Sequence, residues 1–156
     1  PFFGLGLGMQ MAVVEFARDV CSLDADTTER TPNAADPVID LMEEYKDADP
    51  RAAGTMRLGG YACELAEGSL ARAAYGVDAV VERHRNRYEI NPRYVPALEA
   101  HGMAVTGVCS TNHLPEIVEL REHRWFVGTA AHAEFTSRPN RPHPLFVSFL
   151  GAAIER

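Results

Sequence analysis

The chain has 156 residues, of which 46% are apolar and 24% charged, proportions typical of a single globular domain. Fifteen Lys and Arg residues against 22 Asp and Glu residues give a net charge of −7. The basic residues form no run, which argues against capture of nucleic acid or of an anionic membrane surface. Cys21, Cys63 and Cys109 lack C-x-x-C spacing, so neither a disulfide framework nor a cysteine-rich zinc site is indicated, and a cytoplasmic location is expected.

The first fourteen residues are uncharged, but they are too few to span a bilayer and have no basic flank. A buried strand over Pro1–Leu5 is the better prediction, followed by a tight glycine turn. A helix is then expected, because apolar residues recur with i, i+3, i+4, i+7 spacing at Met9, Ala12, Val13, Phe16, Ala17 and Val20. The abrupt apolar opening predicts that part of the domain lies upstream of Pro1.

The segment Ser22–Gly54 is rich in Asp, Thr, Pro and Ala, and its prolines break any periodicity. It is predicted to be an irregular surface excursion, either a lid or only a loop. Beyond it the pattern predicts strands and short helices in alternation, which favours an α/β sandwich with a mostly parallel central sheet and antiparallel additions. The strands are expected at Arg57–Leu65, Val80–Ile90, Met103–Cys109, Glu116–Leu120 and Trp125–Ala130, and the helices at Leu70–Tyr75, Pro92–Glu99 and Pro144–Glu155.

The glycines Gly4, Gly6 and Gly8 lie where the first strand passes into the first helix. Such a turn can hold a phosphate or present a nucleophile. The dinucleotide-binding pattern G-x-G-x-x-G fails in either register, and no G-K-[ST] follows for a P-loop. The flanking small residues at Gly4 and Gly8 suit a nucleophile elbow, but the central residue is Gly6.

The opening P-F-F-G-L-G-L-G-M-Q resembles the P-F-x-G-x-C-L-G-M-Q elbow of the glutamine amidotransferase domain of the CTP synthase family, a class I amidotransferase. More specific blocks follow in the same order, and the resemblance covers nearly the whole chain. They are Asp36–Ile39, Gly54–Gly59 (G-T-M-R-L-G), Glu82–Glu89 (E-R-H-R-N-R-Y-E), Phe135–Pro139, Arg141–Pro142 and Pro144–Phe146. The resemblance implies the class I amidotransferase fold, a three-layer α/β sandwich, with residues 1–156 forming part of that domain and the first strands and the oxyanion loop upstream.

The implied activity is hydrolysis of glutamine to glutamate and ammonia, through attack by a thiolate on the side-chain amide. His132 and Glu134 resemble the family's general base and the carboxylate that orients it. Alternate residues at a strand end can bring both side chains to one side, although a His two residues from a Glu is by itself usually chance.

Several site positions depart from the family pattern. Gly6 occupies the position of the nucleophilic cysteine, so no thioester can form there and His132 has nothing to activate. Ala130 and Ala133 replace the usual Gln and Pro around the histidine, and Asn86 replaces a second histidine. Together these changes favour relaxed constraint on catalysis over a single engineered substitution. Glycine also tolerates the strained backbone of an elbow.

The positions that would bind glutamine agree with the family pattern better than the catalytic positions do. The resemblance implies that Leu7, Gln10, Glu29, Arg87 and the Tyr88 backbone line the substrate site, with a guanidinium fork suited to a carboxylate. The alternative is structural: Gln10 would pack on its helix, and Arg87 would pair with Glu82 or Glu89 on the sheet.

No metal is predicted, since His101, His113, His123 and His143 lie beside turn-like residues without metal-ligand spacing. The three cysteines are expected to be small buried apolar groups, and none lies in a G-x-C-x-G turn that would make it a substitute nucleophile.

Two functions remain open. The first is the glutaminase domain of a CTP synthase, with its own hydrolysis disabled at Gly6. Its ligand would be glutamine, and its partner a synthase domain, absent from this sequence, that aminates UTP with ATP and Mg²⁺ and through which the protein would form a homo-oligomer. The second is a non-catalytic amidotransferase-like module that binds glutamine or a partner and acts as a scaffold.

Overall fold

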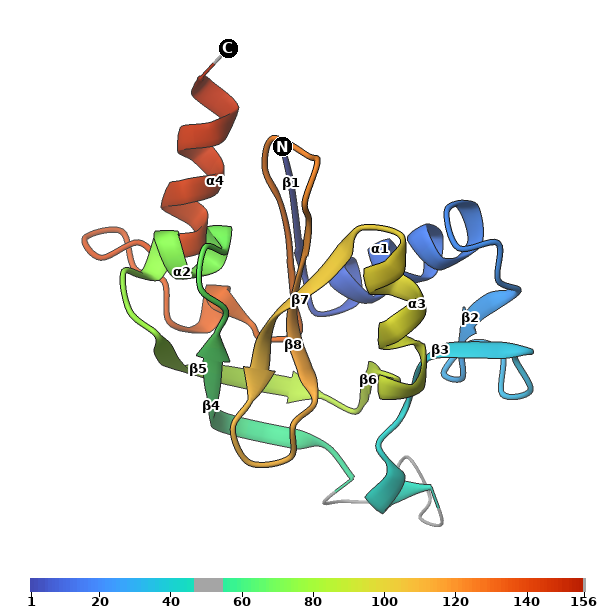
Figure 1. The fold of residues 1–156 in the computed structure, drawn as a ribbon. Helices are drawn as coiled ribbons and strands as arrows, with labels where there is room; N and C mark the ends of the chain where they lie inside the picture. The colour runs from blue at the N-terminus through green and yellow to red at the C-terminus, as the bar shows by residue number, and fades with distance from the viewer. Residues whose placement is uncertain (47–54, 156) are drawn as a thin grey trace.

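The computed structural model describes residues 1–46 and 55–155 and shows an α/β fold built on a curled six-stranded sheet (Figure 1). The strand order is β1-β9-β8-β7-β4-β5, and a separate three-stranded sheet has the order β2-β3-β6. The strands are β1 (Phe2–Leu5), β2 (Ala25–Thr27), β3 (Asp36–Leu41), β4 (Arg57–Leu65), β5 (Ala79–Asn86), β6 (Tyr88–Ile90), β7 (Met103–Cys109), β8 (Pro115–Leu120) and β9 (Phe126–Thr129). The helices are α1 (Leu7–Asp19), α2 (Leu70–Tyr75), α3 (Val95–Ala100) and α4 (Pro144–Ile154), with 3-10 turns at Glu43–Tyr45, Pro92–Tyr94 and Ala133–Phe135.

Two apolar cores lie on opposite faces of the large sheet and make the fold a three-layer sandwich, as predicted. Neighbouring residues of one strand face opposite ways, so on β8 Ile117 packs into one core and Val118 into the other. The first core holds α1, α3 and the small sheet, with Met9 and Leu98 fully buried. The second core holds α2 and α4 against Trp125 and Val127.

The strand directions differ from the prediction of a mostly parallel sheet. Among the described residues of the large sheet only β1 and β9 pair in parallel, and the remaining neighbours are antiparallel. The reason is the length of the connections: β7, β8 and β9 follow one another through short turns, which can join only antiparallel neighbours, whereas a parallel pair needs a long crossover.

The segment Ser22–Gly54 is more regular than predicted. It contains β2 and β3, which pair in parallel under α1, and β3 pairs with β6 from much later in the chain. These strands are only three and six residues long, and Pro37 lies within β3, so the sequence pattern does not reveal them. Residues 47–54 of the predicted excursion lie outside the described residues.

The predicted strand Val80–Ile90 is two strands. β5 ends at Asn86 in the large sheet, and β6 begins at Tyr88 in the small one. Arg87 lies at the change of sheet, a position that removes it from regular strand pairing. The predicted helix Pro92–Glu99 similarly begins as a 3-10 turn and continues as α3, and the other predicted elements agree with the structure within two residues.

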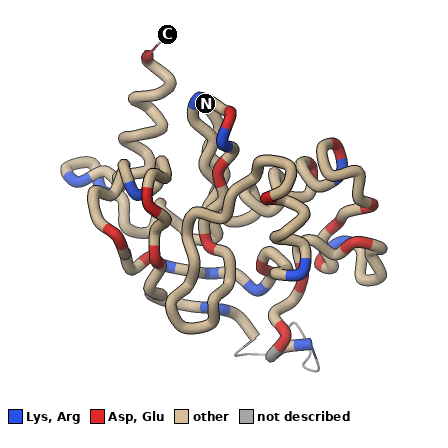
Figure 2. The backbone as a smooth tube through the Cα atoms, in the orientation of Figure 1, with Lys and Arg blue, Asp and Glu red and all other residues tan. Residues whose placement is uncertain are grey.

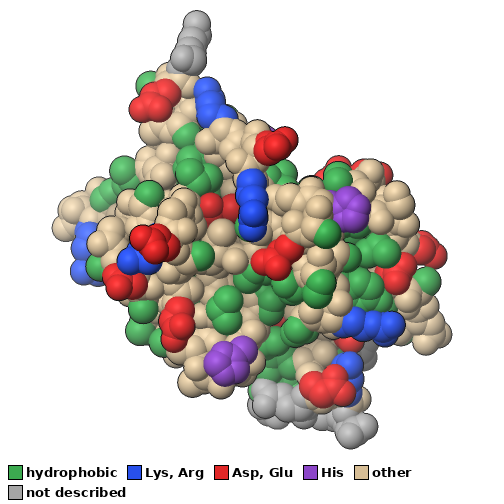
Figure 3. Space-filling model, viewed as in Figure 1, with side chains coloured by type: hydrophobic (Ala, Val, Ile, Leu, Met, Phe, Trp, Pro, Cys, Tyr) green, Lys and Arg blue, Asp and Glu red, His purple; other side chains and the backbone are tan. Residues whose placement is uncertain are grey.

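The surface carries charges of both signs. Blue and red segments are interleaved along the tube in Figure 2, and the face in Figure 3 mixes apolar side chains with both kinds of charge. Within residues 1–46 and 55–155, no helix has the length and apolar character needed to cross a bilayer.

Candidate functional site

The turn between β1 and α1 meets the end of β9 at one edge of the sheet. Because β1 and β9 are parallel, their carboxyl ends lie together, and the Gly6 N–H donates to the Thr129 carbonyl oxygen at 2.9 Å. The chain leaving β9 reaches His132 three residues later. Open α/β folds bind their ligands at such carboxyl ends.

Gly4 is required by the turn, whereas Gly6 relieves backbone strain there. A Cβ at Gly4 would lie 2.8 Å from the Met9 nitrogen and 2.9 Å from the Gly8 carbonyl carbon, so only glycine fits. Gly6 has φ +49°, in the left-handed region, and any other residue there is strained. Gly8 differs from the prediction, because a Cβ there would meet nothing within 4 Å.

His132 faces the position that a side chain at residue 6 would occupy. A Cβ on Gly6 would lie 3.2 Å from His132 Nε2 and 3.2 Å from Cε1. On the other side of the ring, His132 Nδ1 lies 2.6 Å from Glu134 Oε1. When Nδ1 donates its proton to Glu134, Nε2 is left as the acceptor. This is the tautomer that His132 needs to act as a general base on a side chain at residue 6. The predicted base and orienting carboxylate are thus adjacent in space.

Two further groups position His132. The ring of Phe135 stacks on the imidazole with centroids 4.9 Å apart and planes 15° apart. The His132 N–H donates to the Arg83 carbonyl oxygen at 2.8 Å, which ties the loop to the outer strand β5. Phe135 belongs to a sequence block that resembles the family, but no sequence signal points to a backbone contact at Arg83.

Gln10 and Tyr88 join the first helix to the small sheet. The Gln10 side chain is buried, and its Nε2 donates to the Tyr88 carbonyl oxygen at 2.9 Å. The structural alternative for Gln10 is therefore realised in part, with the amide packed between α1 and β6. Gln10 lies one helical turn after Gly6, whose carbonyl oxygen accepts the Gln10 N–H at 3.1 Å.

Arg87 is oriented by a backbone carbonyl. Its Nε donates to the Thr55 oxygen at 3.3 Å, a bond that does not use the two terminal nitrogens of the guanidinium. The alternative partners for Arg87 are engaged elsewhere, since Glu89 pairs with Arg57 at 2.8 Å and Glu82 lies 2.9 Å from His143 Nε2. A guanidinium fork is the group that binds a carboxylate in bidentate fashion.

Glu29 and Arg87 both act electrostatically on Tyr88. Burial and the Glu29 carboxylate raise the pKa of the Tyr88 hydroxyl, and the Arg87 guanidinium opposes them. The structure thus brings Glu29, Arg87 and Tyr88 into one neighbourhood, although Glu29 lies about sixty positions earlier in the chain. Leu7, the remaining predicted lining residue, is 61% exposed at the start of α1.

Asp26 organises the turn that carries Glu29, a role that sequence reasoning missed. Its carboxylate accepts from the Thr27 N–H, from Arg30 and from the Thr31 hydroxyl, each at 2.8 Å. The Arg30 hydrogen bonds are the main reason that the pKa of Asp26 lies well below its usual range. An Asp followed within five residues by Thr, Arg and Thr is a turn signal that could have been recognised.

A buried charge cluster lies beneath this region. Arg57, 1% exposed, lies 2.8 Å from Glu89 and 2.5 Å from Glu116, and His84 Nε2 lies 2.7 Å from the other Glu116 oxygen. Burial opposes the charge of Arg57, but the two carboxylates outweigh it and raise its pKa. Asn86 belongs to this cluster, since its amide lies between His84 and Glu89. Asn86 thus has a structural role in this cluster.

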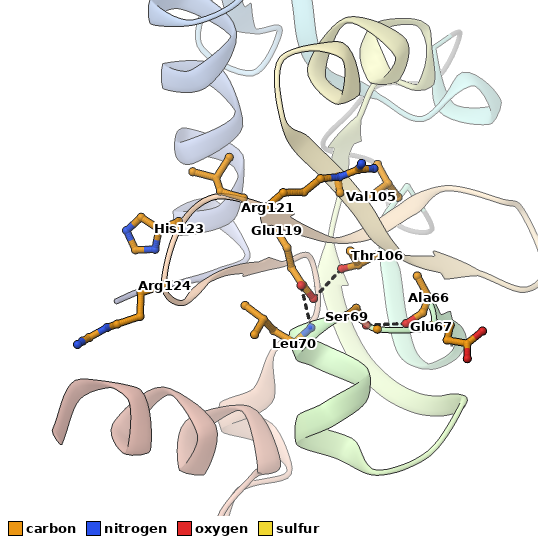
Figure 4. A pocket seen from close by; sticks show the side chains of 13 residues that line it. Ala66, Glu67, Ser69, Leu70, Val105, Thr106, Glu119, Arg121, His123 and Arg124 are labelled. Atoms are coloured by element: carbon orange, nitrogen blue, oxygen red, sulfur yellow. Dashed lines mark hydrogen bonds between the residues drawn. The ribbon is translucent and has the colours of Figure 1, made fainter. Parts of the chain in front are cut away.

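A cavity of about 520 Å³ lies elsewhere, between the start of α2 and strands β7 and β8 (Figure 4). Glu119 points into it and accepts from the Leu70 and Ala71 N–H groups at 2.9 and 3.0 Å and from the Thr106 hydroxyl at 2.9 Å. None of the predicted site residues lines this cavity. Its polar groups fasten α2 to the sheet.

The comparisons with known proteins fit the geometry at the β1–α1 turn. The family description "Glutamine amidotransferase class-I" matches residues 1–152. The chain belongs to the class I glutamine amidotransferases. This amidotransferase chain is 53% identical to a CTP synthase from Geobacter sulfurreducens and 51% identical to one from Methanothermobacter thermautotrophicus, in each case over 100% of the chain and 29% of the relative's length.

Solved structures show the same fold. The glutaminase domain of Trypanosoma brucei CTPS with bound acivicin matches with TM-score 0.91 and 34% identity, over 100% of this chain and 61% of that one. A Thermoplasma acidophilum protein described as part of a GMP synthase is 11% identical and matches with TM-score 0.56, over 97% of this chain and 56% of that one, which shows the shared fold alone. The amidotransferase chain spans less than a third of the length of the curated relatives it matches.

Proposed function

We propose that this chain is the glutaminase domain of a CTP synthase, that it binds glutamine, and that it does not hydrolyse it. The observation that carries the proposal is the arrangement around Gly6. His132 Nε2 faces residue 6 with Nδ1 against Glu134, which is the geometry of a base and its orienting group, while residue 6 supplies no thiol. Without a nucleophile the dyad has no proton to accept, and no thioester forms.

Glutamine recognition has different requirements from hydrolysis. The α-carboxylate of glutamine would bind the terminal nitrogens of Arg87, and the α-amino group would bind Glu29 and the Tyr88 backbone. None of these groups depends on a thiol. Affinity for glutamine is therefore expected to persist in a chain that lacks hydrolysis.

The remaining parts of the reaction belong to the proposed whole protein. Its synthase domain would use ATP and Mg²⁺ to aminate UTP, would mediate homo-oligomer formation, and would act in the cytoplasm. No cofactor is proposed for residues 1–156, which on this view are one part of the amidotransferase domain.

Calorimetric titration of glutamine into the full-length protein tests the binding step. Arg87→Ala should weaken glutamine binding by about 1.5–3 kcal/mol, the worth of a charge-assisted contact. His132→Ala is the matched control and should leave ground-state affinity nearly unchanged, because it removes a group that acts on the reaction rather than on the amino-acid end. Equal losses in the two variants, or no binding by the parent protein, would favour the scaffold function.

A further inference from the structure

The cysteines Cys63 and Cys109 are directly opposite each other on neighbouring antiparallel strands. Cys63 lies on β4 and Cys109 at the end of β7, and the strand register pairs their Cα atoms. Residues paired in this way project from the same face of a sheet. Both side chains are buried, with 1% and 0% exposure.

The ladder hydrogen bonds define the kind of pair. The Ser110 N–H donates to the Ala62 oxygen at 3.0 Å, and the Ala66 N–H donates to the Thr106 oxygen at 2.8 Å. Hydrogen-bonded and non-hydrogen-bonded pairs alternate along an antiparallel ladder, so the intervening pair of Cys63 and Cys109 is of the non-hydrogen-bonded kind. Such pairs have Cα atoms about 4.5 Å apart, within the range that a disulfide can bridge.

Each thiol has a different neighbour in the reduced protein. Cys63 Sγ lies over Gly107, where a Cβ would come within 2.9 Å of the sulfur. Cys109 Sγ lies 3.1 Å from the Thr111 hydroxyl oxygen and accepts from Arg57 at 3.7 Å. The two sulfurs are not bonded in this structure, and a rotation of Cys109 would remove one of the contacts of Arg57.

We propose that Cys63 and Cys109 form a reversible cross-strand disulfide when the protein meets a small oxidant of the peroxide class. The Cys109 sulfur, beside the Arg57 guanidinium, attacks one peroxide oxygen. The O–O bond breaks, Cys109 becomes a sulfenic acid, and the released hydroxide takes the proton of the Cys109 thiol to form water.

Cys63 completes the reaction. Burial raises its pKa to about 12, so it reacts from the thiol form and acts second. Its sulfur attacks the Cys109 sulfur, the S–O bond breaks, and the Cys63 proton leaves with the hydroxide as water. In sum two thiols lose two electrons and two protons, and one peroxide becomes two waters. The proposal concerns a site separate from glutamine binding and does not depend on it.

Hydrogen peroxide treatment of the full chain tests the proposal, with intact mass and non-reducing peptide mapping as readouts. We expect a mass loss of two hydrogens, a peptide linking β4 to β7, and full reversal by dithiothreitol. Cys21, which is only partly buried, is the internal control and should remain available to alkylation after the treated protein is unfolded.

Variants separate the pair from general oxidation. Cys63→Ala and Cys109→Ala should each abolish the linked peptide, whereas Cys21→Ala should leave its yield unchanged. The parent protein alone is decisive if a variant fails to fold. The proposal is wrong if both Cys63 and Cys109 can still be alkylated after the peroxide treatment, or if Cys109 proceeds to sulfinic acid without linkage to Cys63.

Discussion

Two groups of paired side chains in this molecule have opposite environments. The His132–Glu134 pair lies at the surface, with side-chain exposures of 22% and 46%. The cluster of Arg57 with Glu89 and Glu116 is almost wholly buried. Exposed pairs contribute little to stability, whereas breaking a buried pair leaves an uncompensated charge. Burial therefore distinguishes the pair proposed as base and orienting group from the cluster that holds the sheet together.

The largest effect is expected at Arg57. Arg57→Met should reduce the free energy of unfolding by about 3–5 kcal/mol, because Glu89 and Glu116 would stay buried without their common partner. Urea unfolding measures this loss. Arg85→Met, on the exposed face of β5, is the matched control and should change stability by less than about 0.5 kcal/mol. A loss below about 1 kcal/mol for Arg57→Met would show that the cluster is not the structural anchor described here.

An intermediate effect is expected at Asp26 and should depend on pH. The folded-state pKa of Asp26 is depressed, so its contribution to stability is present above the unfolded-state pKa and is lost as the pH falls towards the folded value. At pH 7, Asp26→Asn should cost about 1 kcal/mol, a modest value because Arg30 is largely solvent-exposed.

Measuring the free energy of unfolding at a series of pH values tests this contribution of Asp26. The stability difference between the parent and Asp26→Asn should shrink steadily below about pH 4, near the ordinary pKa of an aspartate. Asp24→Asn, at an exposed neighbouring position, is the control and should change the free energy of unfolding at pH 7 by less than about 0.5 kcal/mol. A difference that stays constant between pH 7 and pH 3 would mean that the Asp26 carboxylate is not the group that fastens the turn.

The smallest effect on stability is expected at His132. His132→Ala should change the free energy of unfolding by less than about 0.5 kcal/mol, because the ring is partly exposed and its partner Glu134 is solvated. Thermal unfolding of the variant beside the parent would measure it. A loss comparable to that of Arg57→Met would remove the distinction between the two groups.

The sequence predicts most of the large sheet, because β4, β7, β8 and β9 have apolar patterns bounded by clear turn residues. It does not predict β2 and β3, which are short: β2 pairs with β3, and β3 pairs on its other side with β6, more than forty residues later. The directions of the strands depend on the lengths of the connections, which the apolar pattern of the sequence does not determine.

The candidate site could likewise be predicted only in part from the sequence. The proximity of His132 to Gly6 is foreseen through the family resemblance, and the structure supplies the geometry. The role of Asn86 could not be foreseen, because it depends on a buried cluster assembled from β4, β5, β6 and β8. Side chains that meet only through long-range strand pairing leave no local pattern in the sequence.

The proposed loss of hydrolysis at residue 6 is tested most directly by a glutaminase assay of the full-length protein beside its Gly6→Cys variant. The parent should release no measurable ammonia from glutamine, since losing the nucleophile of a hydrolase costs up to about 10⁶-fold in rate. Gly6→Cys should gain turnover that disappears on adding His132→Ala, and Gly6→Ala should gain none. Turnover in the parent at an ordinary amidotransferase rate would contradict the claim and point to Cys21, Cys63 or Cys109, and an inactive but folded Gly6→Cys protein would show that more than the thiol has been lost.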